Sequence, residues 1–305
     1  MMKSPNGRKI DAGATLAVIA AMVCWSVGPI FIKLLTASVD SWTQNLLRYL
    51  VACFFWLPFM IFSWRRGRLE SGIWRKAVLP AAANIVMQCL WAAAYYYIDP
   101  AFMYLLSKST IIWIAGFSLI FFADERVLIR SARFWLGMVM SVGGVIGIMI
   151  FKKDFSTTST LTGIVITLSS GAAWAVYTIL VRVSFRDIDS RNGFSVMSIY
   201  TAAGLGALAL IFGRVQDSFN MGTAPWVYVA VSALMSIAFS HVLYYAAIRR
   251  IGATIPSLAL LATPFLVLAI SYAVFGETLN AFQWISGIIL LSGSGLAVWA
   301  QEHLG

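Results

Sequence analysis

Long runs of apolar residues, separated by short polar connections, occupy the chain from one end to the other. A helix that crosses the hydrocarbon core of a bilayer needs about 20 mostly apolar residues. The longest connection, residues 63–76, is too short to bury a core of its own. The pattern predicts an all-α integral membrane protein with ten transmembrane helices near residues 13–35, 42–62, 77–97, 100–122, 134–151, 161–183, 193–213, 225–247, 253–275 and 281–300.

The second half of the chain repeats features of the first half at a fixed spacing. Ala101 stands 24 residues before Glu125, and Ala253 stands 24 residues before Glu277. Each half would contain five spans, and an odd number of spans turns the second copy upside down in the membrane. We therefore expect two inverted five-helix repeats, residues 1–152 and 153–305, with a substrate site between them near the midplane.

Composition supports the membrane class and limits the partners. The chain is 60% hydrophobic and 11% charged, with a mean hydropathy of +0.84, whereas charged residues make up roughly a quarter of soluble domains. The net charge is +10, but the basic residues are dispersed over short connections and form no single face for nucleic acid. We expect a lipid bilayer and a small molecule as the partners, and no nucleic acid.

The placement of basic residues predicts the orientation. If both termini are cytoplasmic, the outer connections hold only Lys152, Lys153 and Arg214, and most other Lys and Arg lie inside, as the positive-inside rule requires. The basic segment 1–11 leads into a run of full spanning length, which favours an uncleaved first helix. We expect a multi-pass plasma membrane protein, in a bacterium the inner membrane protein, with both termini cytoplasmic.

A set of residues accompanies the ten-helix pattern: Trp25, Ser26, Lys33, Arg48, Pro264, Gly276 and Glu277. This combination resembles the EamA family of the drug/metabolite transporter superfamily over nearly the whole chain. The chain departs from the family pattern in its fourth span, where Ile112 stands at the position of Pro264 and Asp124 replaces the glycine that would precede Glu125. The resemblance implies an exporter or exchanger of amino acids or other small metabolites, built around a central cavity.

A polar and aromatic stripe follows one face of the third span. Asn84, Gln88, Trp91 and Tyr95 recur at intervals of four, three and four residues, which places them on one side of a helix. Amides at this depth have no role against lipid, so the stripe faces the protein interior or a water-filled cavity. Cavity lining and hydrogen bonding between packed helices both remain open.

Lys108 interrupts the apolar fourth span. It stands eight residues into that span, roughly 12 Å from its outer end at 1.5 Å per residue. An ammonium at this depth needs water, a partner or a ligand, and the nearest acids lie at the ends of the same span. We consider two alternatives: an anion site for a substrate carboxylate or phosphate, or a lysine solvated by a cavity and hydrogen-bonded to Tyr104. The repeat has Leu260 at this position.

Two further cations and one histidine lie within spans. Lys33 and Arg48 are in the outer parts of the first two spans, where a long stem can carry the charge to the interface; together with Lys108 they would attract anions. His241 is the one histidine within a span, and it is either a hydrogen-bonded packing residue or a proton-coupling group. For the remaining candidates, Trp25, Trp174 and Tyr177, the sequence favours cavity lining and helix packing equally.

Glycines and prolines predict packing and bends. Gly143 and Gly147 in the fifth span and Gly293 in the tenth are close-packing signals. Pro29 and Pro264 lie within the first and ninth spans, where a missing N–H favours a kink; each kink could be a hinge or a static bend.

The sequence contains no motif for catalysis or for a metal or cofactor. It has no nucleophile and base constellation, HExxH, phosphate loop or CxxC pair, and its three cysteines lie in apolar segments. We expect a secondary transporter, not an enzyme, that moves small polar metabolites such as amino acids or organic anions by alternating access. Its substrate is anionic or zwitterionic, and the sequence assigns no cofactor and no oligomeric state. The alternative is a non-transporting membrane receptor or assembly component.

Overall fold

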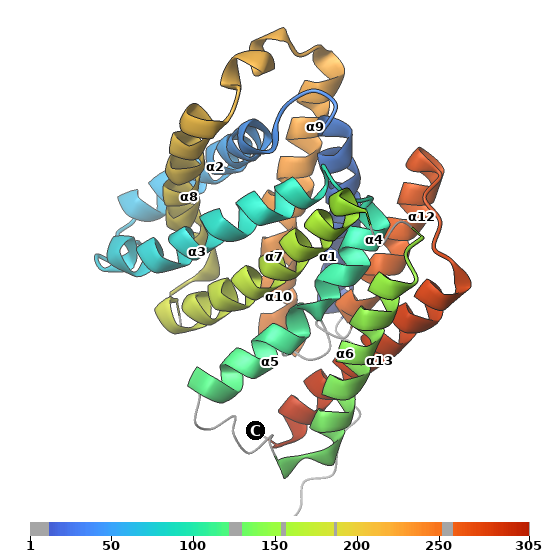
Figure 1. Cartoon of the computed structure of the whole chain (residues 1–305). Helices are drawn as coiled ribbons and strands as arrows, with labels where there is room; N and C mark the ends of the chain where they lie inside the picture. Colours follow the sequence, from blue (N-terminus) through green and yellow to red (C-terminus); the bar gives the residue numbers. More distant parts are fainter. Residues whose placement is uncertain (1–11, 122–129, 154–156, 186–187, 252–258, 305) are drawn as a thin grey trace, which may run out of the picture.

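The computed structural model describes residues 12–121, 130–153, 157–185, 188–251 and 259–304, and every regular element in these ranges is helical (Figure 1). The first half contains α1 Ala12–Leu35, α2 Ser41–Arg65, α3 Ile73–Ala94, α4 Pro100–Leu106, α5 Thr110–Phe121 and α6 Ala132–Ile150. The second half contains α7 Thr158–Ser184, α8 Ser190–Phe212, α9 Thr223–Ala233, α10 Ser240–Ile251, α12 Thr263–Phe275 and α13 Ala281–Leu304.

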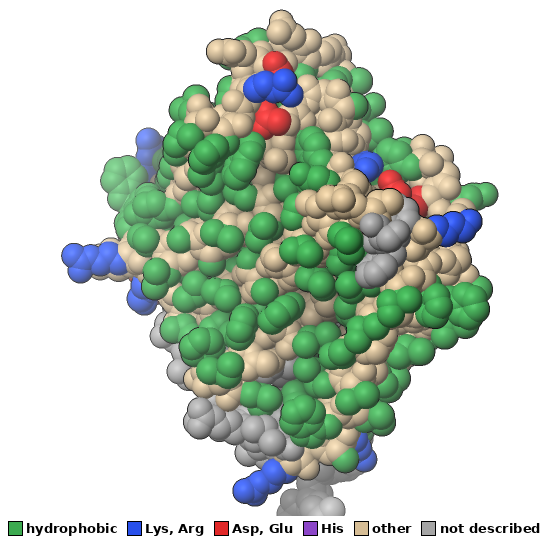
Figure 2. All heavy atoms as spheres, in the orientation of Figure 1, with side chains coloured by type: hydrophobic (Ala, Val, Ile, Leu, Met, Phe, Trp, Pro, Cys, Tyr) green, Lys and Arg blue, Asp and Glu red, His purple; other side chains and the backbone are tan. Residues whose placement is uncertain are grey.

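Among the described residues, nine helical stretches are long and apolar enough to cross a membrane. They correspond to nine of the ten expected spans. For the remaining one, near 253–275, the apolar helix Leu260–Phe275 is shorter, and residues 252–258 lie outside the description. Large apolar side chains are exposed, including Phe54, Trp64 and Leu210. Figure 2 shows a face dominated by hydrophobic side chains, with a few charged groups mostly toward its margin, as contact with lipid requires.

Three expected spans are not continuous α-helices. The fourth is broken by a 3₁₀ turn, Ser107–Ser109, between α4 and α5. The eighth contains a π-helix, Leu234–Phe239, between α9 and α10. In the ninth, the 3₁₀ turn Leu260–Ala262 precedes α12, and Pro264 lies in the first turn of α12. The expectation that Pro264 kinks the interior of a helix is therefore wrong, because a first-turn proline removes no helical hydrogen bond.

The contacts between helices are related by exchange of the two halves of the chain. α6 packs against α13, and α2 packs against α8 (Figure 1). α3 contacts both α7 and α8, and in the same way the stretch from α9 to α10 contacts both α1 and α2. α12 contacts α1, as α4 and α5 contact α7. Exchanging the halves therefore reproduces these contacts.

Glycines allow α6 and α13 to approach at backbone distance. A Cβ on Gly293 would lie 2.6 Å from the carbonyl oxygen of Gly137, and a Cβ on Gly137 would lie 2.7 Å from the oxygen of Gly293. Gly144 and Gly147 meet Leu290 and Ser286 of α13. Gly143 has no atom within 4 Å of its Cβ position, so the expectation that it belongs to this contact is wrong.

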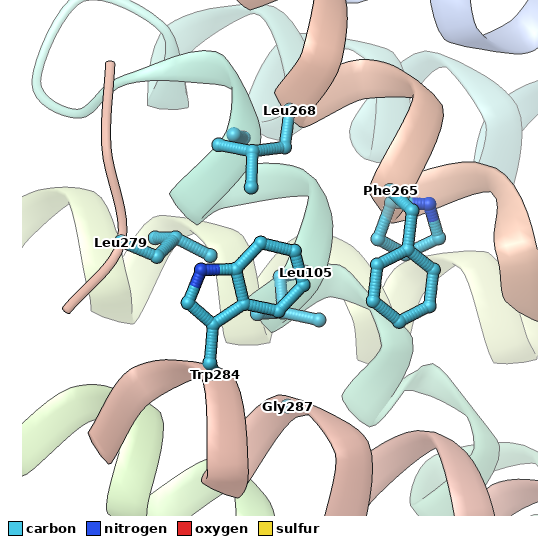
Figure 3. Close-up of a pocket in the computed structure, with 8 residues that line it drawn as sticks. Leu105, Phe265, Leu268, Leu279, Trp284 and Gly287 are labelled. Atoms are coloured by element: carbon cyan, nitrogen blue, oxygen red, sulfur yellow. The ribbon is translucent and has the colours of Figure 1, made fainter. Parts of the chain in front are cut away.

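Between α4, α12 and α13 the structure leaves one small apolar cavity (Figure 3). Its volume of about 10 Å³ is about enough for one water molecule. Polar side chains are absent from its lining, which consists of Ala101, Leu105, Pro264, Phe265, Leu268, Leu279, Trp284 and Gly287. It is too small and too apolar to hold a polar metabolite.

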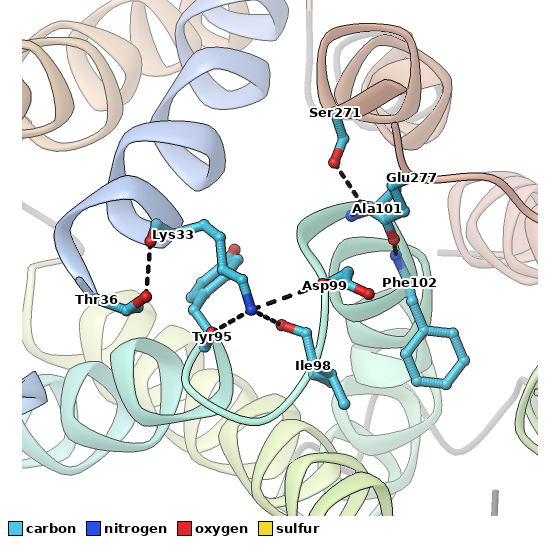
Figure 4. Close-up of polar contacts among 9 residues, drawn as sticks. All are labelled: Lys33, Thr36, Tyr95, Ile98, Asp99, Ala101, Phe102, Ser271 and Glu277. Atoms are coloured by element: carbon cyan, nitrogen blue, oxygen red, sulfur yellow. Dashed lines mark hydrogen bonds and ion pairs between the residues drawn. The ribbon is translucent and has the colours of Figure 1, made fainter. Parts of the chain in front are cut away.

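A group of polar contacts, which we call the outer tie, fixes the start of α4 (Figure 4). The carboxylate of Glu277 accepts the backbone N–H groups of Ala101 and Phe102, each at 2.8 Å, and the hydroxyl of Ser271. These bonds satisfy donors that a helix N-terminus otherwise leaves unpaired. Burial raises the pKa of Glu277, and its three hydrogen bonds act in the opposite direction. The tie joins α12 to α4 although the two are remote in sequence.

Lys33 completes the outer tie from the last turn of α1. Its Nζ donates to the carbonyl oxygens of Tyr95 at 2.9 Å and Ile98 at 3.2 Å, and lies 3.6 Å from Oδ1 of Asp99 (Figure 4). Carbonyls at the end of a helix carry partial negative charge. Lys33 is thus compensated by groups at the α3–α4 connection.

Asp40 makes an equivalent link at the start of α2. Its Oδ1 accepts the backbone N–H groups of Trp42 and Thr43, and its Oδ2 accepts the Thr43 hydroxyl and the N–H of Arg214 from the second half. Burial alone would raise the pKa of Asp40, but these hydrogen bonds together lower it below its ordinary value. An N-cap carboxylate therefore also anchors the connection after α8.

Replacing Gly293 by valine should destabilise the protein, because its Cβ would collide with the backbone of α6. Overpacking of this kind costs about 1–3 kcal/mol. We expect a lower melting temperature in detergent for Gly293→Val. The control is Gly143→Val, which makes the same change at a helical position with open space; equal melting temperatures for the two variants would contradict the contact.

Glu277→Gln should also lower the melting temperature. The amide offers one acceptor oxygen in place of two, so one buried N–H of α4 loses its partner, at a cost of about 1–3 kcal/mol. Asp217→Asn is the control, since Asp217 makes an exposed ion pair with Arg214. If the two variants melt alike, Glu277 does not stabilise the start of α4.

Candidate functional site

Asn84 of the predicted stripe is held between helices. Its Nδ2 donates to the hydroxyl of Tyr49 on α2 at 2.9 Å and to Oγ1 of Thr201 on α8 at 3.2 Å. All three residues are buried. In this arrangement Asn84 links α2, α3 and α8. For this residue, the structure therefore agrees with hydrogen bonding between packed helices, one of the two alternatives considered for the stripe.

The rest of the stripe continues into an aromatic cluster. The ring of Trp91 lies 5.6 Å from that of Tyr95 and 5.9 Å from that of Tyr104, both in edge-on arrangements. The hydroxyl of Tyr95 and Oε1 of Gln88 are buried and have no hydrogen-bond partner in the described part of the chain. Buried polar atoms without partners are costly and call for an explanation. The structure therefore brings Trp91, Tyr95 and Tyr104 together, while Gln88, on the same helix, accepts a hydrogen bond from Asn45 through its backbone carbonyl. Both Gln88 and Tyr95 retain unused hydrogen-bonding capacity.

Lys108 adjoins this cluster at the break between α4 and α5. Its Nζ lies 4.6 Å from the centroid of the Tyr104 ring, so it contacts the ring face and not the hydroxyl that the sequence suggested. Within the described ranges no carboxylate or hydrogen-bond acceptor pairs with the ammonium. A cation–π contact compensates a half-buried ammonium only in part. Lys108 therefore has the Tyr104 ring as a contact and no counter-charge within the described ranges.

Arg48 is enclosed and does not reach the interface, which corrects the expectation for it. The residue is 2% exposed, and its Nη2 donates to Oγ of Ser236 at 3.2 Å. The Nε and Nη1 groups have no partner among the described residues. Ser236 lies in the π-helix Leu234–Phe239. A buried guanidinium with one neutral partner is electrostatically incomplete.

A second aromatic cluster surrounds His241. Its imidazole lies 5.6 Å from the ring of Trp25 and 5.3 Å from that of Phe194, while Trp174 lies 6.5 Å from it and 5.6 Å from Tyr177. Nδ1 of His241 donates to the carbonyl of Ile237 at 3.0 Å. This cluster brings together Trp25, Trp174, Tyr177 and His241 from α1, α7 and α10, in contacts typical of a packed histidine.

Three structural features were outside the reach of sequence reasoning. Ser236 had no distinguishing pattern, because one serine in an apolar run is common. The π-helix gives no periodic signal, and π-helices recur at functional sites. Glu277 was recognised only as the end of a repeat, although its match with Glu125 marked it; Asp124 and Glu125 lie outside the described residues.

Relatives and a solved structure are similar to this chain over most of its length. An uncharacterized transporter of Archaeoglobus fulgidus is 24% identical over 94% of this chain and 98% of its own. An uncharacterized transporter of Haemophilus influenzae is 25% identical over 64% of this chain and 63% of its own. A crystal structure at 16% identity covers 95% of this chain and 98% of its own, with a TM-score of 0.63, which indicates a shared fold.

The family model gives the assignment. The model of the EamA-like transporter family matches this chain twice, over residues 12–150 and 161–299. Both matches fall on spanning helices, and together they include α1 to α6 and nearly all of α7 to α13. The two clusters and both buried cations lie within them. This chain is a multi-pass membrane protein of the EamA-like transporter family.

Proposed function

We propose that the protein is a secondary transporter that exports or exchanges small polar metabolites, such as amino acids or organic anions, by alternating access. The proposal includes two inverted five-helix repeats, residues 1–152 and 153–305, in a bacterial inner membrane with both termini cytoplasmic. Family membership and the paired contacts across the halves support it. Inverted repeats with a site between them are a recurring plan of such transporters.

One observation carries the proposal: Lys108 lies where the fourth span is interrupted. The 3₁₀ turn Ser107–Ser109 separates α4 from α5, and another 3₁₀ turn, Leu260–Ala262, lies at nearly the same position of the repeat. Interrupted helices near the midplane form the substrate sites of many transporters, and 3₁₀ segments within helices often mark hinges. Lys108 would then bind the anionic group, with Gln88, Trp91, Tyr95 and Tyr104 orienting the substrate.

Alternating access would follow from movement of the halves at these turns. The outer tie would close the outer end, because Lys33 and Glu277 connect α1 and α12 to the α3–α4 connection. Opening to that side would break these contacts. The spans 12–35, 41–65, 73–94 and 100–121 hold no Asp or Glu, so uniport or exchange fits better than proton antiport through a membrane carboxylate. The packed His241 supports no separate coupling step.

Lys108→Gln should weaken substrate affinity about tenfold or more, because it removes a charged partner worth about 1.5–3 kcal/mol. Lys108→Arg should keep most of the affinity. A thermal-shift screen of purified protein over amino acids, carboxylates and phosphate esters identifies a ligand, and flux into proteoliposomes then shows transport.

Leu260→Gln is the matched control, since Leu260 stands at the repeat position of Lys108; we expect unchanged affinity. Wild-type affinity in both Lys108 variants would exclude Lys108 as the anion site. Absence of flux for every ligand class, with a stoichiometric protein partner in the purified sample, would instead identify a receptor or assembly component.

A further inference from the structure

The charges within the spans are not balanced by the protein itself. In the first half, Arg48 and Lys108 lie well inside described spans, and Lys33 lies in the last turn of α1. No Asp or Glu occurs in residues 12–35, 41–65, 73–94 or 100–121. Lys33 is compensated by Asp99 and two carbonyls. Arg48 and Lys108 have no carboxylate partner among the described residues. Two positive charges are therefore left without counter-charges inside the membrane.

The guanidinium of Arg48 has hydrogen-bond donors that no protein group uses in the described structure. Its hydrogen-bond partner Ser236 is pressed against Gly28 of α1, where a Cβ would lie 2.5 Å from Cβ of Ser236. Nε and Nη1 of Arg48 remain unused in the described structure. A guanidinium offers its donors in a planar fork that matches a carboxylate. A carboxylate could accept hydrogen bonds from these unused Nε and Nη1 groups.

Arg48 and Lys108 lie at a similar depth in the membrane. Arg48 is seven residues from the start of α2, and Lys108 is eight residues from the start of α4, roughly 10 Å and 12 Å along the two helix axes. The second and fourth spans start on the same side of the membrane, because one span separates them. Both cations are thus near the same level, inward from the outer tie.

The aromatic cluster lies between these two cations. Tyr95 interacts electrostatically with both Arg48 and Tyr104. Trp91 contacts the rings of Tyr95 and Tyr104, and Lys108 lies over the Tyr104 ring. The rings of Trp91, Tyr95 and Tyr104 thus form one cluster near both cations, and the Tyr95 hydroxyl has no hydrogen-bond partner among the described residues.

We propose that Arg48 and Lys108 form two anion subsites of one substrate site, and that the substrate is a dicarboxylate with an apolar spacer. One carboxylate binds the Nε and Nη1 groups of Arg48, the other binds the ammonium of Lys108, and the spacer lies on Trp91, Tyr95 and Tyr104. This inference rests on the proposed transport function and names its substrate class. The buried residues admit the substrate when the halves separate.

Charge balance favours a dicarboxylate over the other substrate classes. A monocarboxylate or a zwitterion leaves at least one buried cation uncompensated, which is costly in a low dielectric. A phosphate monoester carries its charge on one group and cannot occupy both subsites. An apolar spacer suits the ring surfaces of Trp91, Tyr95 and Tyr104. A dicarboxylate supplies one carboxylate for each cation, and its apolar spacer contacts the aromatic rings.

The test compares ligands of one length and different charge on purified protein. We expect adipate to bind at least tenfold more tightly than hexanoate or 6-aminohexanoate, by thermal shift and by competition in proteoliposomes. The affinities of the shorter succinate and the longer suberate, compared with that of adipate, then indicate the distance between the two subsites. We expect one chain length to bind most tightly. Arg48→Gln and Lys108→Gln should each reduce adipate affinity to that of hexanoate, and the exposed-cation control Arg214→Gln should leave it unchanged.

A second measurement separates a ligand-binding arginine from a structural one. Replacing an uncompensated buried charge by an apolar side chain of similar length does not destabilise a protein, so Arg48→Met without ligand should melt no lower than the wild type. It should also lose the stabilisation by adipate. A large fall in its melting temperature would overturn the subsite and make Arg48 a structural residue.

The remaining outcomes distinguish this inference from the proposed function. Adipate affinity that depends on Lys108 and not on Arg48 would overturn the second subsite and leave transport intact. Tighter binding of 6-aminohexanoate, or of glycerol 3-phosphate, would overturn the dicarboxylate class in favour of a zwitterion or a single phosphoryl group. Absence of binding and flux for every probe would overturn the proposed function as well.

Discussion

The low dielectric of the bilayer governs this structure, because every polar group removed from water must find a partner within the protein. Helices satisfy their own backbones, so the described chain is helical almost throughout. Side-chain carboxylates satisfy exposed helix starts, as Glu277 does for α4 and Asp40 for α2. Where polar atoms remain without partners, the molecule carries a cost that a function can explain.

The same constraint distinguishes the three cations of the first half. Lys33 is held by carbonyls and Asp99 and contributes to structure. Arg48 has one serine as its partner, and Lys108 has one aromatic ring. The three cations thus differ in the partners that the fold brings to them, and only Lys33 has a carboxylate among those partners.

Departures from regular helix coincide with these incomplete groups. Lys108 lies in a 3₁₀ turn, and the partner of Arg48 lies in a π-helix. A 3₁₀ turn recurs near Leu260, where the repeat has no charge. The interruption therefore does not require the lysine, which indicates that the turn belongs to the shared architecture of the halves and that the charge is specific to the first copy.

The sequence by itself determined the class and the family resemblance, because apolar run lengths and repeat spacing follow from the thickness of the bilayer. It also singled out Lys108 and, except for Phe194, the residues of both aromatic clusters. It did not reveal that Asn84 links three helices, that Gly143 is open while Gly144 is packed, or that Arg48 is enclosed beside Ser236. These features depend on which residues distant in sequence meet, and a helical period identifies a face without identifying its neighbour. Only the tertiary structure decided which polar groups have partners among the described residues and which do not.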